Sequence, residues 1–360
     1  MEEGKLTTAV LGLTGPGSLL LTAAVQTGHF RIKAVADKDT KLLQQASAEY
    51  HCAAYDDYRQ LIMQNQLDCL LVAADIHTCD EHIKAALKKK FNILKLPPPA
   101  RDFEEAAELV KLAQSENVTF AVANAARFTP SFSDAHDVLL KNQIEQVYLI
   151  EAFYSADDSD RPAWQTDPKL AGGGVLLHDC FHIIDQILWS FPIPEQIYAL
   201  TTNQAPDKQQ RRYLTEDTVI LSMRFTDTLV GNLTAFRRAN VGPKNEFIRI
   251  YGKDKILTVT GNNIVITDRV GQKSHEHKYN SDSSLALVKL LDSFALSLIA
   301  PNDNRFFSTL CDNLKNMAVI KSTYLSASTG FPEEPRRILL MSSNSIQPSE
   351  AINWSGKYRD

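Results

Sequence analysis

Hydrophobic and polar positions follow two different rhythms along the chain. In the first part, short runs of Val, Ile, Leu and Ala alternate with longer segments whose apolar residues recur with a helical period. Strands are predicted at 6–11, 30–36, 67–74, 92–96 and 118–123, and helices at 19–25, 41–50, 58–64, 81–89 and 103–116. Strands separated by helices form parallel sheets with both faces covered. Residues 1–125 are therefore predicted to form a doubly wound α/β domain.

The rhythm changes after residue 125. Strand-like runs now come in near succession, at 147–153, 196–202, 218–225, 229–236, 247–251, 256–259 and 264–267. Apolar and polar positions alternate within them, which is typical of an antiparallel sheet whose faces have unlike environments. Residues 126–360 are predicted to form a second domain, of α+β type, with a large, mostly antiparallel open sheet. Helices near 181–189 and 284–298 pack against this sheet or against the first domain.

Composition and charge narrow the function classes. The chain has 360 residues, more than one core usually supports, with 44% apolar and 22% charged residues and a net charge of −5. This charge creates no positive field for nucleic acid or an anionic membrane. No apolar run approaches the roughly 20 residues of a membrane span. We therefore expect a small-molecule substrate as partner, with no nucleic acid and no membrane.

The cysteines and the N-terminal residues indicate the cellular compartment of the protein. Five scattered cysteines form no Cys-x-x-Cys pair, which is typical of reduced thiols. Residues 1–5 lack the positive region of a signal peptide. A cytoplasmic protein is expected.

A glycine-rich segment, GLTGPG at residues 12–17, follows the first predicted strand. A dinucleotide site needs a tight turn, bare backbone where the pyrophosphate approaches, and a helix N-terminus that binds phosphate. Thr14 stands where the G-x-G-x-x-G pattern has its middle glycine, so Gly15 is expected to take over that role. Gly12, Thr14, Gly15 and Gly17 are the expected cofactor contacts. The alternative is a turn that only connects strand to helix.

Asp37 ends the second predicted strand. A carboxylate at this place accepts hydrogen bonds from the hydroxyls of the adenosine ribose, which favours NAD over NADP. Lys38 beside it either contacts a 2′-phosphate or is a solvated charge. We expect NAD or NADP as cofactor, with NAD favoured.

Further motifs continue along the chain. They are NAARFTP at 124–130, GGGVLLHDCFH at 172–182, EDTV at 216–219, NMA at 316–318 and STG at 328–330. With the glycine turn and Asp37, their order and spacing resemble the glucose–fructose oxidoreductase, inositol dehydrogenase and rhizopine catabolism (Gfo/Idh/MocA) family over nearly the whole chain. The resemblance implies an N-terminal Rossmann domain, a C-terminal open sheet for substrate binding and oligomerisation, and nicotinamide-dependent oxidation or reduction of sugars, polyols or related compounds.

The segments expected at the nicotinamide depart from the family pattern. Family members carry Glu-Lys-Pro, whose lysine positions the substrate hydroxyl and helps to deprotonate it, where this chain has Leu-Pro-Pro at 96–98. Pro97 has no side-chain donor and cannot act as a base. Asp75 and Cys79 stand where proline and histidine are usual. Ala74, Asp75 and Pro97 are thus expected to line a rebuilt pocket.

The segment after the three glycines resembles the family motif G-G-G-x-x-x-D-x-x-x-H, whose histidine is the acid/base. His182 matches that histidine, and imidazole, with an unperturbed pKa of about 6.5, suits proton transfer. His178 stands in the aspartate position, followed by Asp179. On a continuous helix, His178 and His182 would share a face. Three interpretations stay open: His182 as acid/base with His178 and Asp179 at the substrate, structural histidines, or a divalent metal held by both histidines.

Other candidates are ambiguous. Trp164 offers a face for a sugar ring or belongs to a surface turn. Arg127 binds an anionic substrate group or a carboxylate at a domain interface. Asp217 and Arg237 lie at strand ends, where charged residues are usually solvated. The polar stretch around His275 is predicted to be an exposed loop.

Together these observations favour an NAD(P)-dependent oxidoreductase for a sugar, polyol or cyclitol, with His182 as acid/base. Loss of the lysine at Pro97 leaves a second hypothesis, a non-catalytic regulatory protein of the same fold that senses a dinucleotide or sugar. A third, a metal-dependent lyase or hydrolase that keeps NAD as a redox relay, rests on His178 and His182. Because an open sheet leaves an apolar face to cover, a homodimer or homotetramer is expected.

Overall fold

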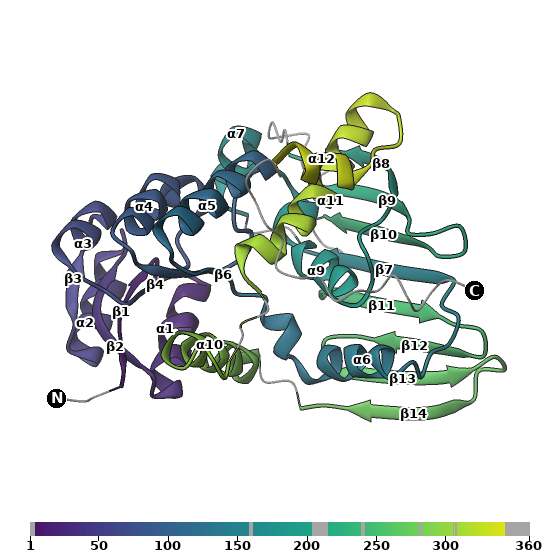
Figure 1. The fold of residues 1–360 in the computed structure, drawn as a ribbon, viewed down its shortest axis with the longest axis horizontal. Coiled ribbons are helices and arrows are strands. Elements are labelled where there is room, and N and C mark those ends of the chain that lie inside the picture. Colours follow the sequence, from purple (N-terminus) through teal and green to yellow (C-terminus); the bar gives the residue numbers. More distant parts are fainter. Residues whose placement is uncertain are drawn as a thin grey trace. The chain divides into compact units, whose positions relative to one another are not determined.

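The computed structural model describes residues 4–157, 161–203, 215–238, 242–280, 283–304, 306 and 308–342. The chain divides into two compact units, each built on its own sheet (Figure 1). The first unit comprises Met1–Phe128 and Asp282–Asp312, and the second comprises Thr129–Ser281 and Asn313–Asp360. Within the described residues, no helix combines the length and the apolar character that a membrane span requires.

The first unit contains a six-stranded sheet in the order β3-β2-β1-β4-β5-β6. Its strands are β1 (Leu6–Leu11), β2 (Phe30–Ala36), β3 (Ala53–Tyr55), β4 (Cys69–Val72), β5 (Asn92–Lys95) and β6 (Phe120–Val122). All neighbouring pairs are parallel, which confirms the predicted doubly wound Rossmann sheet. The strand order reverses between β1 and β4, and ligands of such sheets bind at the carboxyl ends of the strands at this switch point.

Helices cover both faces of this sheet (Figure 1). One face carries α1 (Pro16–Thr27) and α2 (Thr40–Tyr50), and the other carries α3 (Tyr58–Gln64), α4 (Ile76–Lys88) and α5 (Phe103–Glu116). This arrangement follows from right-handed crossovers in a sheet whose order reverses at β1. It buries the central strands most fully, as in β4, where all four residues are buried, whereas no residue of the edge strand β3 is buried.

Helix α10 (Ser283–Ile299) belongs to the first unit although it follows the second sheet in sequence. Leu290, Leu291 and Phe294 share a buried cluster with Leu20 of α1. The chain then passes β6, where the Val122 amide donates to the Ser308 carbonyl at 2.8 Å. The predicted division into 1–125 and 126–360 omitted this returning segment. Helical periodicity marks an apolar face but does not say which core that face joins.

The second unit contains an eight-stranded sheet in the order β14-β13-β12-β11-β7-β10-β9-β8. Its strands are β7 (Leu149–Ala156), β8 (Gln196–Thr202), β9 (Thr218–Arg224), β10 (Val230–Arg237), β11 (Asn245–Tyr251), β12 (Lys255–Val259), β13 (Asn263–Asp268) and β14 (Lys273–Lys278). Only β7 and β10 pair in parallel among these strands. The predicted mostly antiparallel sheet is confirmed.

Strand β14 corrects one expectation, because the polar stretch around His275 was predicted to be a loop. All six of its side chains are exposed, so the sequence shows no apolar alternation. Backbone pairing with β13 holds the segment at the sheet edge, for example between Val265 and Glu276. Charged side chains on an edge strand also oppose pairing with other chains.

Helices cover one face of the second sheet (Figure 1). They include α6 (Pro130–Leu140), α8 (Val175–His178), α9 (Phe181–Ser190) and α11 (Leu310–Thr329). The other helical elements of this unit are η2 (Ala163–Thr166), α7 (Pro168–Ala171) and α12 (Pro335–Ser342), and η1 (Ala125–Phe128) ends the first part of the first unit. Helix α9 is tied to α11 by a buried hydrogen bond, in which Asn316 Nδ2 donates to Asp185 Oδ1 at 2.8 Å. Lys315 Nζ also donates to the Leu188 carbonyl at 2.6 Å. These bonds fix the helix that carries His182.

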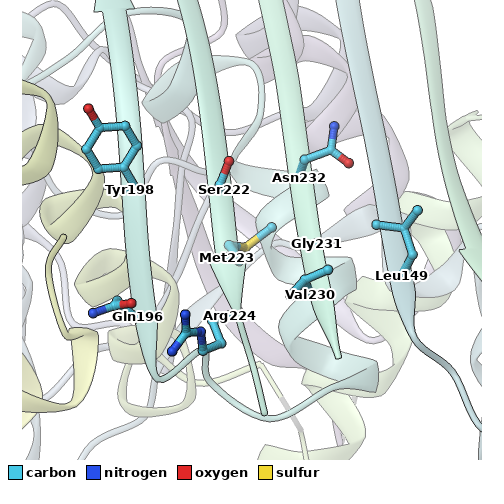
Figure 2. Close-up of a pocket in the computed structure, with 9 residues that line it drawn as sticks. All are labelled: Leu149, Gln196, Tyr198, Ser222, Met223, Arg224, Val230, Gly231 and Asn232. Carbon is cyan, nitrogen blue, oxygen red and sulfur yellow. The ribbon is translucent and has the colours of Figure 1, made fainter. Parts of the chain in front are cut away.

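The other face of this sheet exposes apolar side chains. Tyr198, Leu200, Ile220 and Val230 are each more than 40% exposed. A pocket of about 420 Å³ opens on this face, and Figure 2 shows the side chains that line it, which come from β8, β9, β10 and β7. It is lined by Leu149, Gln196, Tyr198, Ser222, Met223, Arg224, Val230, Gly231 and Asn232. Most of these residues alternate with buried positions, so the pocket lies on the face opposite to the helices.

Candidate functional site

The glycine segment forms a tight turn between β1 and α1. A Cβ on Gly12 would lie 2.5 Å from the Ala74 amide nitrogen, and a Cβ on Gly17 would lie 2.1 Å from the Gly12 carbonyl oxygen. Gly15 has a φ of +59°, and among the described residues no atom beyond its chain neighbours lies within 4 Å of the place where a Cβ would stand. The turn is therefore closely packed at Gly12 and Gly17 and leaves room for a ligand at Gly15.

Gly15 is the N-cap of α1, so the open part of the turn lies at the N-terminus of this helix. The helix has no side-chain N-cap and no acidic residue in its first turn, so its N–H groups and dipole are suited to an anion. Thr14 turns its hydroxyl back toward Asp37, 3.3 Å from each carboxylate oxygen. With that side chain directed to β2, the open place at Gly15 fits the approach of a pyrophosphate. The residues present thus fit a dinucleotide.

Asp37 holds the turn from the end of β2. Its carboxylate accepts hydrogen bonds from the backbone amides of Leu13, of Thr14 at 3.0 Å and of Asp39 at 2.8 Å. The residue is 5% exposed. The carboxylate therefore organises the glycine turn, a role that the sequence did not predict. Its contact with the adenosine ribose stays a prediction.

The other expected cofactor residues follow the carboxyl ends of neighbouring strands. Lys38 follows β2, and its Nζ donates to the Asp56 carbonyl at 2.7 Å. Ala74 is buried after β4, and Asp75 is exposed at the N-terminus of α4. Pro97 is half-buried after β5. All of them lie at the edge of the sheet at which the glycine turn stands, and their contacts with a cofactor stay predictions.

A buried carboxylate holds the segment that carries the histidines. Glu216 accepts hydrogen bonds from the amides of Gly174 at 2.7 Å and Leu176 at 3.0 Å, and from the Tyr324 hydroxyl at 2.9 Å. Burial raises the pKa of Glu216 although these hydrogen bonds oppose the rise. A Cβ on Gly174 would lie 1.8 Å from the Glu216 carbonyl oxygen, so only glycine fits there.

The histidine segment is not one continuous helix. Helix α8 ends at His178 and α9 begins at Phe181. His178 Nε2 lies 2.9 Å from the Ala171 carbonyl oxygen, and its ring meets Trp164 edge-on with centroids 5.6 Å apart. The expectation that His178 and His182 share one helical face does not hold, because the break lets the two rings turn to different partners.

His182 lies in a polar cluster at the start of α9. Its Nε2 lies 2.9 Å from Glu246 Oε2, and Lys244 Nζ lies 2.8 Å from the same oxygen. The Tyr154 ring meets the imidazole at a steep angle, with centroids 6.3 Å apart. The His182 side chain is 24% exposed, so the imidazole combines a fixed carboxylate partner with access from solvent.

Asp179 belongs to the same cluster. Arg237 NH1 lies 2.8 Å from Asp179 Oδ2, and the Tyr154 hydroxyl donates to Asp179 Oδ1 at 3.3 Å. Burial raises the pKa of Tyr154, and the charges of Asp179 and Glu246 raise it further. The phenol therefore keeps its proton and acts as a donor beside the imidazole.

Strand register explains why these side chains meet. Glu246 pairs with Tyr154 across β11 and β7, and Arg237 pairs with Ala156 across β10 and β7. Side chains two residues apart on a strand point to the same face. Because Ile248 faces the helix-covered side, Glu246 faces it too. The covered face is apolar at its centre and becomes polar at this end.

The sequence pattern did not single out Glu246, Lys244 or Tyr154. It also left Arg237 and Asp217 as solvated strand ends, but these residues are 5% and 0% exposed. They point to the helix-covered face, where burial is set by the packing of the helices and not by position along a strand. The sequence signal that could have identified them is the period of two along β10 and β11. This period places the polar residues at the strand ends on the same face as the buried residues.

The remaining predicted residues are divided between the units. Arg127 is 7% exposed in η1 of the first unit, whereas Trp164 and Asp179 belong to the second. Among the described residues, no group of three or more His, Cys, Asp or Glu side chains is arranged to hold a metal ion. The substrate roles of Arg127, Trp164, Asp179 and His178 stay predictions.

Two family models match the chain. Residues 6–124, within the first unit, match an oxidoreductase family with an NAD-binding Rossmann fold, and residues 132–258, within the second, match the GFO/IDH/MocA C-terminal domain. The chain belongs to the Gfo/Idh/MocA oxidoreductase family. Its members are NAD(P)-dependent oxidoreductases. The family expected from the sequence motifs is confirmed.

Curated relatives of this Gfo/Idh/MocA protein are distant. An uncharacterised oxidoreductase from Schizosaccharomyces pombe is 24% identical over 155 residues, which make up 42% of each chain. The alignment thus spans less than half of that relative. The myo-inositol 2-dehydrogenase of Thermotoga maritima is 22% identical over 230 residues, covering 63% of this chain and 67% of the relative.

Solved structures match the Gfo/Idh/MocA protein over nearly its whole length. Levoglucosan dehydrogenase in complex with NADH and levoglucosan has a TM-score of 0.82 at 16% identity, covering 92% of this chain and 99% of that chain. At such low identity the likeness establishes the fold.

Proposed function

We propose that this protein oxidises or reduces a sugar, polyol or cyclitol with a nicotinamide cofactor. The observation that carries the proposal is the cluster around His182, in which a solvent-accessible imidazole is held by a carboxylate. The names of similar proteins support the substrate class, since one is a myo-inositol 2-dehydrogenase and another binds levoglucosan.

In the proposed reaction, His182 carries the proton. When the substrate is oxidised, the imidazole takes the proton of the reacting hydroxyl, and it returns that proton in the reverse direction. The nicotinamide, when bound, exchanges hydride with the substrate carbon. Trp164, His178 and Asp179 in the second unit and Arg127 in the first are proposed to contact the substrate.

NAD is the proposed cofactor, held at the glycine turn. Gly12, Gly15 and Gly17 provide bare backbone, and the N-terminus of α1 binds the pyrophosphate. The Asp37 carboxylate at the end of β2 would repel a 2′-phosphate, which favours NAD over NADP.

NADH is therefore expected to raise the melting temperature of the protein more than NADPH does. A ligand at 100 times its Kd stabilises the native state by about 2.7 kcal/mol, which raises Tm by several degrees. Asp37→Ser is expected to remove the preference. Asp39→Ser is expected to keep the preference for NADH, because serine can replace Asp39 as the N-cap of α2. Equal stability with and without all four nicotinamide nucleotides would refute the cofactor assignment, and a larger rise with NADPH would refute the preference.

A second candidate function rests on Pro97. A chain without the family lysine suits a regulatory protein that binds the dinucleotide and does no chemistry. Such a protein would show the melting shift with NADH but no turnover of any sugar, polyol or cyclitol.

We also propose that a second copy of the chain covers the outer face of the eight-stranded sheet. Leu200 pairs with Ile220 across β8 and β9, and both are exposed. Exposed apolar patches of this kind mark interfaces. Light scattering on the eluted protein is expected to give a dimer or tetramer, and Ile220→Lys a smaller species. Val270→Lys, at an 81% exposed position in the turn before β14, is the control that keeps the mass. A monomeric unaltered protein would contradict the proposal.

A further inference from the structure

The lysine nearest to Pro97 in sequence does not replace the lysine that the family pattern places there. Lys95 is 3% exposed. Its Nζ donates to the carbonyl oxygens of Leu96 at 3.3 Å and Pro98 at 2.8 Å. The ammonium is thus buried in the backbone of its own loop. A lysine that acts on the proposed acid/base must come from another part of the chain.

Lys244 lies directly before β11, and its ammonium and the His182 ring contact the same carboxylate oxygen. Glu246 Oε2 lies 2.8 Å from Lys244 Nζ and 2.9 Å from His182 Nε2. Lys244 Nζ also stands 5.5 Å from the centroid of the Tyr154 ring, a cation–π contact that helps to hold it there. The Lys244 side chain is 52% exposed, so a cation stands at the open side of the cluster.

The carboxylate between these two groups is ionised. Burial by itself would raise the pKa of Glu246, but the hydrogen bond from His182 and the charges of His182 and Lys244 outweigh burial and lower it to about 2. An ionised carboxylate accepts hydrogen bonds and donates none. Nε2 of His182 must therefore carry a proton, and in the neutral ring Nδ1 is the nitrogen that can accept one.

We propose that Glu246 and Lys244 are positioning residues for His182 in the reaction proposed above, on which this inference rests. Glu246 fixes the proton on Nε2 and leaves Nδ1 as the base. Lys244 keeps Glu246 ionised, so that a proton taken from the substrate stays on the imidazole. The substrate O–H bond breaks, an N–H bond forms at Nδ1, and the electron pair of the adjacent C–H bond leaves as the hydride that the nicotinamide accepts.

Other charged and titratable groups join this cluster. Tyr154 of β7 meets the imidazole and donates to Asp179 in the loop between α8 and α9, and Asp179 in turn pairs with Arg237 of β10. Asp179 and Arg237 form an ion pair at 2.8 Å, so their charges largely cancel at His182. The Glu246–Lys244 pair is therefore expected to have the largest electrostatic effect on the His182 ring.

The proposal is tested by nitrogen-15 NMR of the histidine rings in the full-length protein without substrate, which shows which ring nitrogen of a neutral imidazole carries the proton. The His182 signals are identified by their loss in His182→Gln. In Glu246→Gln the neutral His182 ring is expected to lose its preference for a proton on Nε2, because a glutamine amide can donate as well as accept. In Lys244→Ala the pKa of Glu246, followed by carbon-13 NMR of its carboxyl carbon, is expected to rise, because a cation that lowers it is gone.

A matched control is available on strand β14. Lys273 is 57% exposed and forms an ion pair with Glu276 at 2.7 Å, but β14 is separated from β11 by two strands. Lys273→Ala is expected to leave the His182 ring signals and the pKa of Glu246 unchanged. An unaltered preference for Nε2 in Glu246→Gln, or an unaltered pKa of Glu246 in Lys244→Ala, would overturn the proposal.

Turnover separates this inference from the proposed function. With NAD and myo-inositol as the probe, Glu246→Gln is expected to lower kcat at least tenfold, Lys244→Ala to lower it less, Lys244→Arg to restore most of that smaller loss, and Lys273→Ala to leave it unchanged. If the unaltered protein turns over no sugar, polyol or cyclitol while the NMR signals of His182 and Glu246 change as expected, the proposed reaction is wrong and the coupling of the pair to His182 stands. Full kcat in Lys244→Ala would overturn the role of Lys244.

Discussion

Replacing His182 by glutamine is expected to lower kcat about 10²- to 10⁴-fold, the usual contribution of a general acid/base. The glutamine amide can still donate a hydrogen bond to Glu246, but it cannot take a proton from the substrate hydroxyl. The effect is measured by steady-state kinetics at 340 nm with the best substrate from a panel of sugars, polyols and cyclitols. The melting temperature of the variant should stay close to that of the unaltered protein.

His275→Gln is the control for this substitution. His275 is an exposed histidine on β14 of the same unit, and its replacement is expected to leave kcat unchanged. If His182→Gln keeps more than about a tenth of the turnover, below the loss expected for a general acid/base, another group performs the proton transfer.

The second large effect is expected from Gly17→Ala. The new Cβ would stand 2.1 Å from the Gly12 carbonyl oxygen, so the turn must open. Overpacking of this kind costs about 1–3 kcal/mol, and it displaces the backbone that is proposed to hold the pyrophosphate. We expect a lower melting temperature and loss of the stabilisation by NADH, both measured by thermal unfolding.

Gly28→Asn tests the same helix at its other end. Gly28 is the C-cap of α1 and has a φ of +75°, a left-handed conformation that asparagine tolerates. In the part of the chain that the structure describes, no atom beyond its chain neighbours lies within 4 Å of the place where a Cβ would stand. This variant is expected to keep the NADH response. A Gly17→Ala protein that responds to NADH like the unaltered protein would show that the dinucleotide does not bind over this turn.

Much of the fold follows from local pattern. The predicted strands 6–11 and 30–36 have the bounds that the structure gives to β1 and β2, because a buried run between turn signals has clear ends. The membership of α10 and the pairing of β14 could not be predicted in this way. Each depends on contacts with segments far away in sequence. Such contacts do not change the pattern of apolar and polar residues within the segment.

The residues of the candidate site also divide into those that a local sequence pattern predicts and those that only the structure identifies. The glycine turn, Asp37 and His182 carry local signals, since each follows a strand or a glycine run at a recognisable spacing. Glu246 and Lys244 are found only through the register of β11 against β7 and through the break between α8 and α9 that turns His182 toward the sheet. A one-residue change of register would send Glu246 to the opposite face.

The central claim, hydride exchange between a polyol and a nicotinamide cofactor, is tested most directly by isotope transfer. The unaltered protein is incubated with NAD and a panel of sugars, polyols and cyclitols that carry deuterium on the carbinol carbons, and the NADH formed is analysed by mass spectrometry. We expect deuterium in the NADH with at least one member of the panel, and about 10²- to 10⁴-fold slower transfer with His182→Gln. No transfer from any member, by a protein whose melting temperature does rise with NADH, would contradict the proposed reaction and favour the dinucleotide-sensing alternative.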